Sequence, residues 1–340
     1  MHDRLDISMK ANHLIGAVMA VAVLAAAGAF AATGNSFWIR LATEALILGG
    51  LALSVDILLG YTGLLSLGQA LYFGVGAYVS TLILRDTPSF WLAMGGAVLA
   101  SLLAGVIGGL IANRVRGVYF ALITFGLAQV MANIVYNTRA LGASDGLIGV
   151  PVLEIDLGLT TVDAGNPLQF FLLTLVVIVL LYAAIGYLLS TPFGRVIQAL
   201  KANEKRVGYL GYSVWAPRMV AYVIAALVAG IAGALYPMLR GFVSPELMFF
   251  AASGNAVVMV IVGGAGTLVG ALFGAMLITF LKSFIGSLTE HHHIFIGLIF
   301  MASILFLPRG IIGSVKPPVE RALRRREARA EAAAAKGALR

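Results

Sequence analysis

The sequence contains no cysteine among its 340 residues, and only 11% of its residues are charged. The absence of cysteine excludes a disulfide framework and any metal or redox site built on thiolates. Soluble domains carry about 25% charged residues, so this chain has less than half of the usual supply for a water-facing surface. It also lacks a GxxxxGK[ST] sequence, so we do not expect this chain to bind and hydrolyse ATP itself.

Hydrophobic residues make up 60% of the chain. They form runs close to the length of about 20 residues with which a helix crosses a bilayer. The runs lie at 14–32, 41–59, 62–84, 92–112, 118–137, 168–189, 219–239, 246–263, 265–284 and 292–308. The sequence therefore predicts an all-α polytopic membrane protein with about ten transmembrane helices. It excludes a soluble enzyme and a nucleic-acid-binding protein, despite a net charge of +8.

Basic residues are distributed unevenly among the predicted loops. With ten spans, 18 of the 23 Lys and Arg residues fall on one side of the membrane, in segments 1–13, 113–117, 190–218 and 309–340. Because cytoplasmic loops carry the excess of Lys and Arg, both termini are predicted to be cytoplasmic. The basic tail 309–340 is interpreted as a solvated extension near anionic lipid headgroups.

Forty glycines form the second strong signal, since small residues let membrane helices approach closely. Two clusters also mix glycine with Ser or Thr inside apolar runs, an arrangement that permits broken helices around a polar pathway. Their glycines are Gly60, Gly63, Gly68, Gly74 and Gly76, and Gly263, Gly264, Gly266, Gly270 and Gly274. Because the clusters occupy similar places in the two halves, we predict two inverted repeats with broken helices near 60–76 and 263–275.

Ionisable residues inside the predicted spans are few: Glu44, Asp56 and Lys282. Such residues usually face a pathway or a partner. They form no acidic or histidine relay of the kind that couples transport to an ion gradient, so the energy source is expected elsewhere. Asp56 fits either a substrate contact or a hydrogen bond between helices. The candidate lining of a pathway is Asp56, Ser66, Gln69, Asn255 and Thr267.

The longest predicted cytoplasmic loop between spans, 190–218, combines five basic residues with one acid, Glu204. Good helix formers in its middle, between Pro192 and Gly208, predict a short helix across the cytoplasmic face. On charge alone this helix fits equally a docking element for a cytosolic partner and a solvated loop. The adjacent histidines 291–293 point in different directions on a helix or turn, so we predict an outer-surface loop and no metal site.

Six segments, in this order, resemble a permease subunit of the ABC importers for branched-chain amino acids (Leu, Ile, Val), of the M-subunit type. They are GYTGLLSLGQALYFGVGAY (Gly60 to Tyr78), RGVYFALITFGLAQ (Arg116 to Gln129), GASDGLIGVP (Gly142 to Pro151), ALKANEKRVGYLGY (Ala199 to Tyr212), GGAGTLVGALFGA (Gly263 to Ala275) and FLPRGIIG (Phe306 to Gly313). The resemblance runs from about residue 40 to residue 313.

The resemblance implies a transmembrane permease domain over 14–308 in a bacterial inner membrane, flanked by cytoplasmic segments 1–13 and 309–340. The implied partners are a second permease subunit, two cytosolic ATPase subunits and a periplasmic binding protein that delivers the amino acid. ATP and Mg would be bound by the ATPases, with no cofactor and no catalysis in this chain. The loop 190–218 would be the ATPase-coupling loop, with the site residues Arg195, Lys201, Glu204, Lys205, Arg206 and Gly211.

Two departures from the family pattern bear on the function. Glu204 is followed by Gly211 seven positions later, whereas many ABC importers have glycine six positions after the glutamate, and Asp56 stands where Asn is expected. The alternatives are a permease of the same family for urea, short amides or another small organic solute, and an ion-coupled secondary transporter. A membrane-embedded enzyme would need a catalytic constellation, and none is found in the sequence.

Overall fold

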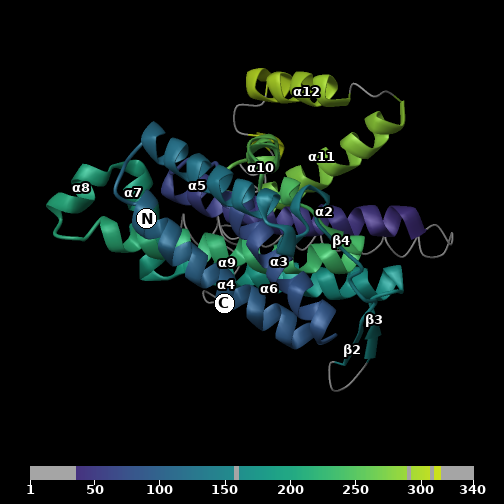
Figure 1. Cartoon of the computed structure of the whole chain (residues 1–340). Coiled ribbons are helices and arrows are strands. Elements are labelled where there is room, and N and C mark those ends of the chain that lie inside the picture. The colour runs from purple at the N-terminus through teal and green to yellow at the C-terminus, as the bar shows by residue number, and fades with distance from the viewer. Residues whose placement is uncertain (1–35, 157–160, 289–291, 307–309, 315–340) are drawn as a thin grey trace, which may run out of the picture.

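The computed structural model describes residues 36–156, 161–288, 292–306 and 310–314, and these residues are mainly helical (Figure 1). The helices are α2 Ser36–Asp56, the π-helix η1 Ile57–Thr62, α3 Gln69–Asp86, α4 Phe90–Ala112, α5 Val118–Asn137, α6 Pro167–Ser190, α7 Pro192–Ala202, α8 Glu204–Tyr209, α9 Trp215–Arg240, α10 Phe250–Gly263, α11 Val269–Leu288 and α12 His292–Phe306. Short 3₁₀ turns are η2 Arg139–Leu141, η3 Ala143–Asp145 and η4 Pro245–Met248.

Two small antiparallel strand pairs complete the described structure. Strand β1 (Leu147–Ile148) pairs with β4 (Phe242–Val243), and β2 (Glu154–Asp156) pairs with β3 (Thr161–Asp163). The first pair joins the α5–α6 connection to the end of α9. The glycine-rich segment Gly142 to Pro151 is therefore fixed against the same end of the molecule as Arg240.

Among the described residues, six helical segments are long and apolar enough to cross a membrane: 36–62, 90–112, 118–137, 167–190, 215–240 and 269–288. They coincide with six of the ten predicted spans and confirm a multi-pass all-α protein. Three further predicted spans correspond to α3, α10 and α12. Helices α3 and α10 are shorter than the predicted spans because non-helical residues 63–68 and the 3₁₀ turn at 245–248 interrupt the apolar runs. The predicted span 14–32 lies outside the described residues.

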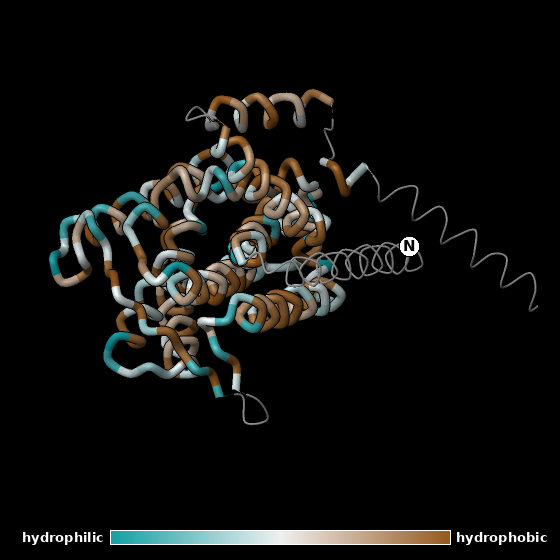
Figure 2. The backbone as a smooth tube through the Cα atoms, turned by 90° about the vertical axis from the view of Figure 1, so that its right-hand side faces the viewer, coloured by the Kyte–Doolittle hydropathy of each residue, from teal (hydrophilic) through white to brown (hydrophobic). Residues whose placement is uncertain are grey.

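Helix α2 lies at the centre of the bundle, packed between α6, α9 and α11 (Figure 1). In the most apolar window of its span 89% of the residues are buried, against 28% in α4. Figure 2 shows that apolar, brown residues predominate along the helices and that hydrophilic, teal residues gather mainly in the connecting segments, as expected for helices that cross a membrane. Most of the buried polar side chains therefore belong to the central helices and the segments between them, whereas α4, α5 and α6 form a mainly apolar periphery with one buried Ser or Thr in each helix: Ser101, Thr124 and Thr174.

Glycine allows the central helices to touch backbone to backbone. A Cβ atom at Gly76 of α3 would lie 2.1 Å from the carbonyl oxygen of Gly230 in α9. The reciprocal contact is equally tight, since a Cβ at Gly233 would lie 1.9 Å from the carbonyl oxygen of Phe73. These approaches match the packing role of small residues in membrane helices.

Both predicted helix breaks are present. The π-helix η1 ends at Thr62, Gly63 adopts a φ of 75°, and residues 63–68 are not helical before α3 begins. In the second half α10 ends at Gly263 and α11 begins at Val269, with Gly266 at a φ of 80° between them. The glycine-rich run at 263–266 is thus a turn between two helices. An inverted-repeat relation between the two halves stays a prediction.

Candidate functional site

The two helix breaks meet at Asp56, the last residue of α2. Its Oδ1 accepts a hydrogen bond from the Gly266 N–H at 2.6 Å, and its Oδ2 accepts one from the Leu268 N–H at 3.0 Å. The side chain is fully buried. N–H groups before and within the first turn of a helix lack partners in that helix and attract negative charge, which explains why an acid at this depth is stable. This geometry is that of a helix-to-helix contact.

Gly60 allows the two breaks to approach each other. A Cβ atom there would lie 2.1 Å from the Asp56 Oδ1 and 2.4 Å from the Gly266 nitrogen. The carbonyl oxygen of Gly60 lies in the last turn of η1, where carbonyls lack partners within the helix. It accepts a hydrogen bond at 2.5 Å from the Nζ of Lys201 in α7. One continuous set of polar contacts therefore joins α7, the first break and the second break.

Three of the predicted lining residues lie in the breaks or directly beside them. Ser66 Oγ accepts hydrogen bonds from the Gly68 N–H at 3.4 Å and from Gln69 Nε2 at 3.3 Å. Thr267 Oγ1 donates to the Gly264 carbonyl at 2.7 Å and accepts from the Gly270 N–H at 3.0 Å. The three predicted side chains are buried in the described structure, and their role as pathway lining stays a prediction.

The fifth predicted residue, Asn255, lies elsewhere. It lines a cavity of about 640 Å³ between α2, α9, α10 and α11, together with Glu44 and Lys282. These two ionisable residues stand out separately in the sequence, and the fold brings them to one cavity. No local sequence signal connects them, because they lie on helices that are far apart in the chain.

The loop 190–218 forms two helices, α7 and α8, in agreement with the predicted helical shape. Glu204, the first residue of α8, forms an ion pair with Arg218 at the start of α9 and a second one with Arg116 at 3.5 Å. Arg218 is buried, so this pair anchors the loop to the bundle. Asn203 caps α8 by accepting a hydrogen bond from the Arg206 N–H at 3.1 Å.

The remaining predicted coupling residues, Arg195, Lys205, Arg206 and Gly211, are exposed. Lys201 is also exposed as a whole residue, and its Nζ donates a hydrogen bond to the Gly60 carbonyl. Gly211 has a φ of 82°, which a side chain with a Cβ rarely adopts, and it turns the chain from α8 back toward α9.

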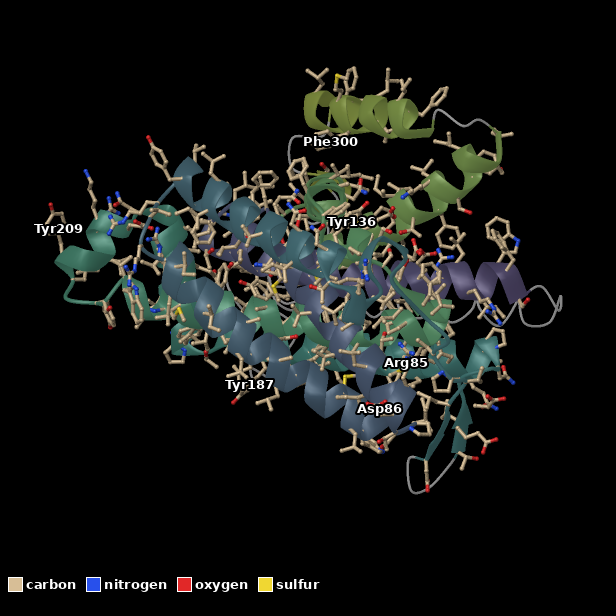
Figure 3. All side chains as sticks on the ribbon, viewed as in Figure 1. Arg85, Asp86, Tyr136, Tyr187, Tyr209 and Phe300 are labelled. Carbon is tan, nitrogen blue, oxygen red and sulfur yellow. The ribbon has the colours of Figure 1, made fainter. Side chains whose placement is uncertain are left out.

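An exposed apolar tip at the end of α8 was not predicted from the sequence. Tyr209 is 89% exposed and Leu210 is 70% exposed, and Tyr212 follows them. Figure 3 shows Tyr209 at the extreme end of the molecule, opposite the end that holds Arg85 and Asp86. The available signal was a pair of aromatic residues around Gly211, at the end of a basic helix. We call Tyr209, Leu210 and Tyr212 the loop tip.

The histidine run provides no site in the described structure. His291 lies outside the described residues, and so do the side chains of His292 and His293. Among the residues that are described, no group of three His, Asp or Glu side chains could hold a metal ion. The backbone of His292 and His293 forms the start of α12 and not a loop, and the side of the membrane on which the histidines lie stays a prediction.

Comparison with known proteins places these features in one family. Residues 37–304 match the family described as the branched-chain amino acid transport system permease component. The chain is 27% identical over 324 residues to the high-affinity branched-chain amino acid transport system permease protein LivM of Salmonella typhimurium, and equally to that of Escherichia coli K12. These alignments cover 89% of this chain and 76% of each relative.

A second type of permease protein is also similar. The chain is 20% identical over 289 residues to the high-affinity branched-chain amino acid transport system permease protein LivH of Escherichia coli K12, covering 80% of this chain and 92% of that protein. No solved structure matches the chain. Because the family match spans most of the chain, this multi-pass membrane protein belongs to the permease components of the branched-chain amino acid transport systems and is a permease subunit of an ABC importer.

Proposed function

We propose that this permease carries branched-chain amino acids across the bacterial inner membrane, after delivery by a periplasmic binding protein and at the expense of ATP hydrolysed in two separate cytosolic ATPase subunits. The observation that supports the substrate class most is the similarity to LivM along 89% of the chain. Similarity to both LivM and LivH supports a paired assembly with a second permease subunit.

The proposed topology has ten spans, both termini in the cytoplasm, and two inverted halves. The membrane domain covers 14–308, between the cytoplasmic segments 1–13 and 309–340. The arrangement of the basic helices supports this orientation. Helix α7 packs against η1 at the first helix break and α8 follows it, and the opposite ends of α2, α9 and α11 lie away from them (Figure 1). The helix breaks then lie on the cytoplasmic side and the cavity on the periplasmic side.

In the proposed mechanism the loop 190–218 transmits movement of the ATPases to the membrane domain. The exposed loop tip contacts an ATPase subunit, and the Glu204–Arg218 ion pair makes α8 move with α9. The Lys201 hydrogen bond transmits the same movement to Gly60 and so to the packed helix breaks. Glu204 thus acts within this chain, and the loop tip supplies the contact surface.

Replacing Tyr209 and Leu210 together by alanine is expected to weaken ATPase binding by about 30-fold or more. Buried aromatic anchors in interfaces commonly contribute about 2 kcal/mol or more, which corresponds to that factor. The measurement is the affinity of the purified ATPase for the permease pair in nanodiscs. Tyr187→Ala is the matched control, because Tyr187 is 76% exposed on α6 and away from the loop tip (Figure 3). Equal affinity for the double variant and the control would place the docking surface elsewhere.

Uptake of radiolabelled leucine into proteoliposomes tests the proposed function. The vesicles contain the permease pair and luminal ATPases, with the binding protein outside. We expect uptake that requires both internal ATP and the binding protein. If leucine is not taken up while a loaded binding protein still stimulates ATP hydrolysis, the substrate is urea, an amide or another solute. Uptake that persists without ATP and stops with an uncoupler would identify an ion-coupled secondary transporter instead.

A further inference from the structure

The cavity between α2, α9, α10 and α11 has the size of a small-molecule site. Its volume of about 640 Å³ lies within the range of roughly 300 to 1,000 Å³ that such sites occupy. Its charged residues all lie near helix ends on one side of the bundle. Arg40 and Glu44 are near the start of α2, Arg240 ends α9, and Lys282 is in the second half of α11. This is the end opposite to α7 and α8.

The charges in the cavity are asymmetric. Glu44 is paired, since its Oε1 accepts a hydrogen bond from Arg240 Nη2 at 2.6 Å. In the part of the chain that the structure describes, Arg40 and Lys282 have no carboxylate partner. Three cations therefore surround one acid. Arg40 and Lys282 are both exposed and lie near helix ends, where a long basic side chain reaches the membrane interface at low cost. They therefore line the cavity as cations that are accessible to an anionic group.

The rest of the wall combines apolar side chains with unused polar groups. Leu51, Met259 and Ile278 supply apolar surface from three different helices. Thr279 also lines the cavity, and its hydroxyl is buried without a hydrogen-bond partner among the described residues. Because this hydroxyl has almost no accessible surface, a ligand in the cavity would reach it only after a change of the Thr279 rotamer.

We propose that this cavity is an outer transit site for an α-amino acid with an apolar side chain. Lys282, with Arg40, receives the carboxylate, Glu44 receives the ammonium group, and Leu51, Met259 and Ile278 contact the side chain. The inference rests on the proposed function and adds to it the location of a solute site within this subunit. Urea and simple amides carry no carboxylate, so this site discriminates against them. A transit site must also release its solute, so weak binding is expected.

The absence of cysteine from the chain makes a single-cysteine experiment direct. Ser283 lines the cavity beside Lys282, and Ser283→Cys introduces one thiol without removing a proposed contact. The assay follows modification of this chain by a small methanethiosulfonate reagent in the complete complex in nanodiscs. We expect leucine to slow the modification at least threefold. Leucinamide, which lacks the carboxylate, should leave the rate unchanged.

The charge requirement is tested in the same background. Adding Lys282→Gln is expected to abolish protection by leucine, and Lys282→Arg is expected to retain it. Arg85→Gln is the matched control, because Arg85 is an exposed cation at the same end of the bundle, on α3, and does not line the cavity (Figure 3). Leucine binding to the complex without the binding protein should fall at least tenfold with Lys282→Gln and remain within threefold with Arg85→Gln.

The outcomes separate this inference from the proposed function. Suppose that the wild-type complex takes up leucine. If leucine then fails to protect the introduced thiol, or protects it equally with and without Lys282→Gln, the transit site is overturned and the importer stands. If leucinamide protects as well as leucine does, the carboxylate contact with Lys282 is wrong. If the wild-type complex does not take up leucine at all, the substrate assignment fails and the site for an amino acid fails with it.

Discussion

Asp56→Ala is expected to destabilise the permease by about 2 to 6 kcal/mol and to abolish transport. Asp56 is fully buried and accepts hydrogen bonds from two backbone N–H groups, those of Gly266 and Leu268. Removal of the carboxylate leaves the buried Leu268 N–H and the partly buried Gly266 N–H without this partner. A buried group of this kind costs about 1 to 3 kcal/mol when it is unpaired. Stability is measured as the denaturation of the purified permease in detergent, which is monitored by the loss of the monodisperse peak in size-exclusion chromatography. Leucine uptake is measured in parallel.

Asp56→Asn separates the charge from the hydrogen bonds. An amide has one acceptor oxygen, so it can replace one of the two bonds and should lose about half as much stability. The matched control is Asp86→Ala, because Asp86 is an exposed acid at the end of α3 (Figure 3), and its removal should stay within about 0.5 kcal/mol of the wild type. If Asp56→Ala were as stable as this control, the carboxylate would not hold the two helix breaks together.

Gly60→Ala is expected to prevent the two breaks from packing and to reduce uptake to background. The added Cβ would lie 2.1 Å from the Asp56 Oδ1 and 2.4 Å from the Gly266 nitrogen, and a backbone atom cannot move away as the end of a flexible side chain can. Overpacking of this kind costs about 1 to 3 kcal/mol or more. The variant should also lose some of the hydrogen bonds to Asp56. Thermal stability and uptake are measured side by side.

Gly126→Ala is the control with the opposite expected sign. Gly126 lies inside α5, and a Cβ atom there would meet no atom within 4 Å. Alanine in an unobstructed helical position commonly stabilises by about 0.4 to 1 kcal/mol, because the unfolded chain loses freedom. Uptake should be unchanged. Equal behaviour of the two glycine variants would mean that the breaks do not pack as closely as the structure indicates.

Local properties of the sequence determined the class of protein. The apolar runs at 92–112, 118–137, 168–189 and 219–239 coincide with α4, α5, α6 and α9, because length and hydropathy are sufficient to define a helix in a membrane. The break at Gly263 and the helical loop between Pro192 and Gly208 were also predictable. Glycine, proline and strong helix formers act on the backbone within a few residues of their own position.

The same local signals overestimated some helices. The predicted spans 62–84 and 246–263 correspond to shorter helices, since α3 begins only at Gln69 and α10 at Phe250. In both cases apolar residues continue through a turn, and hydropathy does not distinguish an apolar turn buried in protein from an apolar helix. Non-helical backbone at this depth is tolerated where other parts of the protein supply its hydrogen-bond partners.

Only the tertiary structure decided what the polar residues do. Asp56 bonds backbone groups more than 200 positions away, Glu204 pairs with the buried Arg218, and Glu44 shares a cavity with Lys282. The sequence identified each of these residues as unusual. Ionisable groups at membrane depth are rare, and Glu204 is the single acidic residue in a basic loop. It could not assign their partners. A carboxylate is stabilised equally by a helix terminus, a cation or a solute, and only the packing of distant helices determines which of these lies within reach.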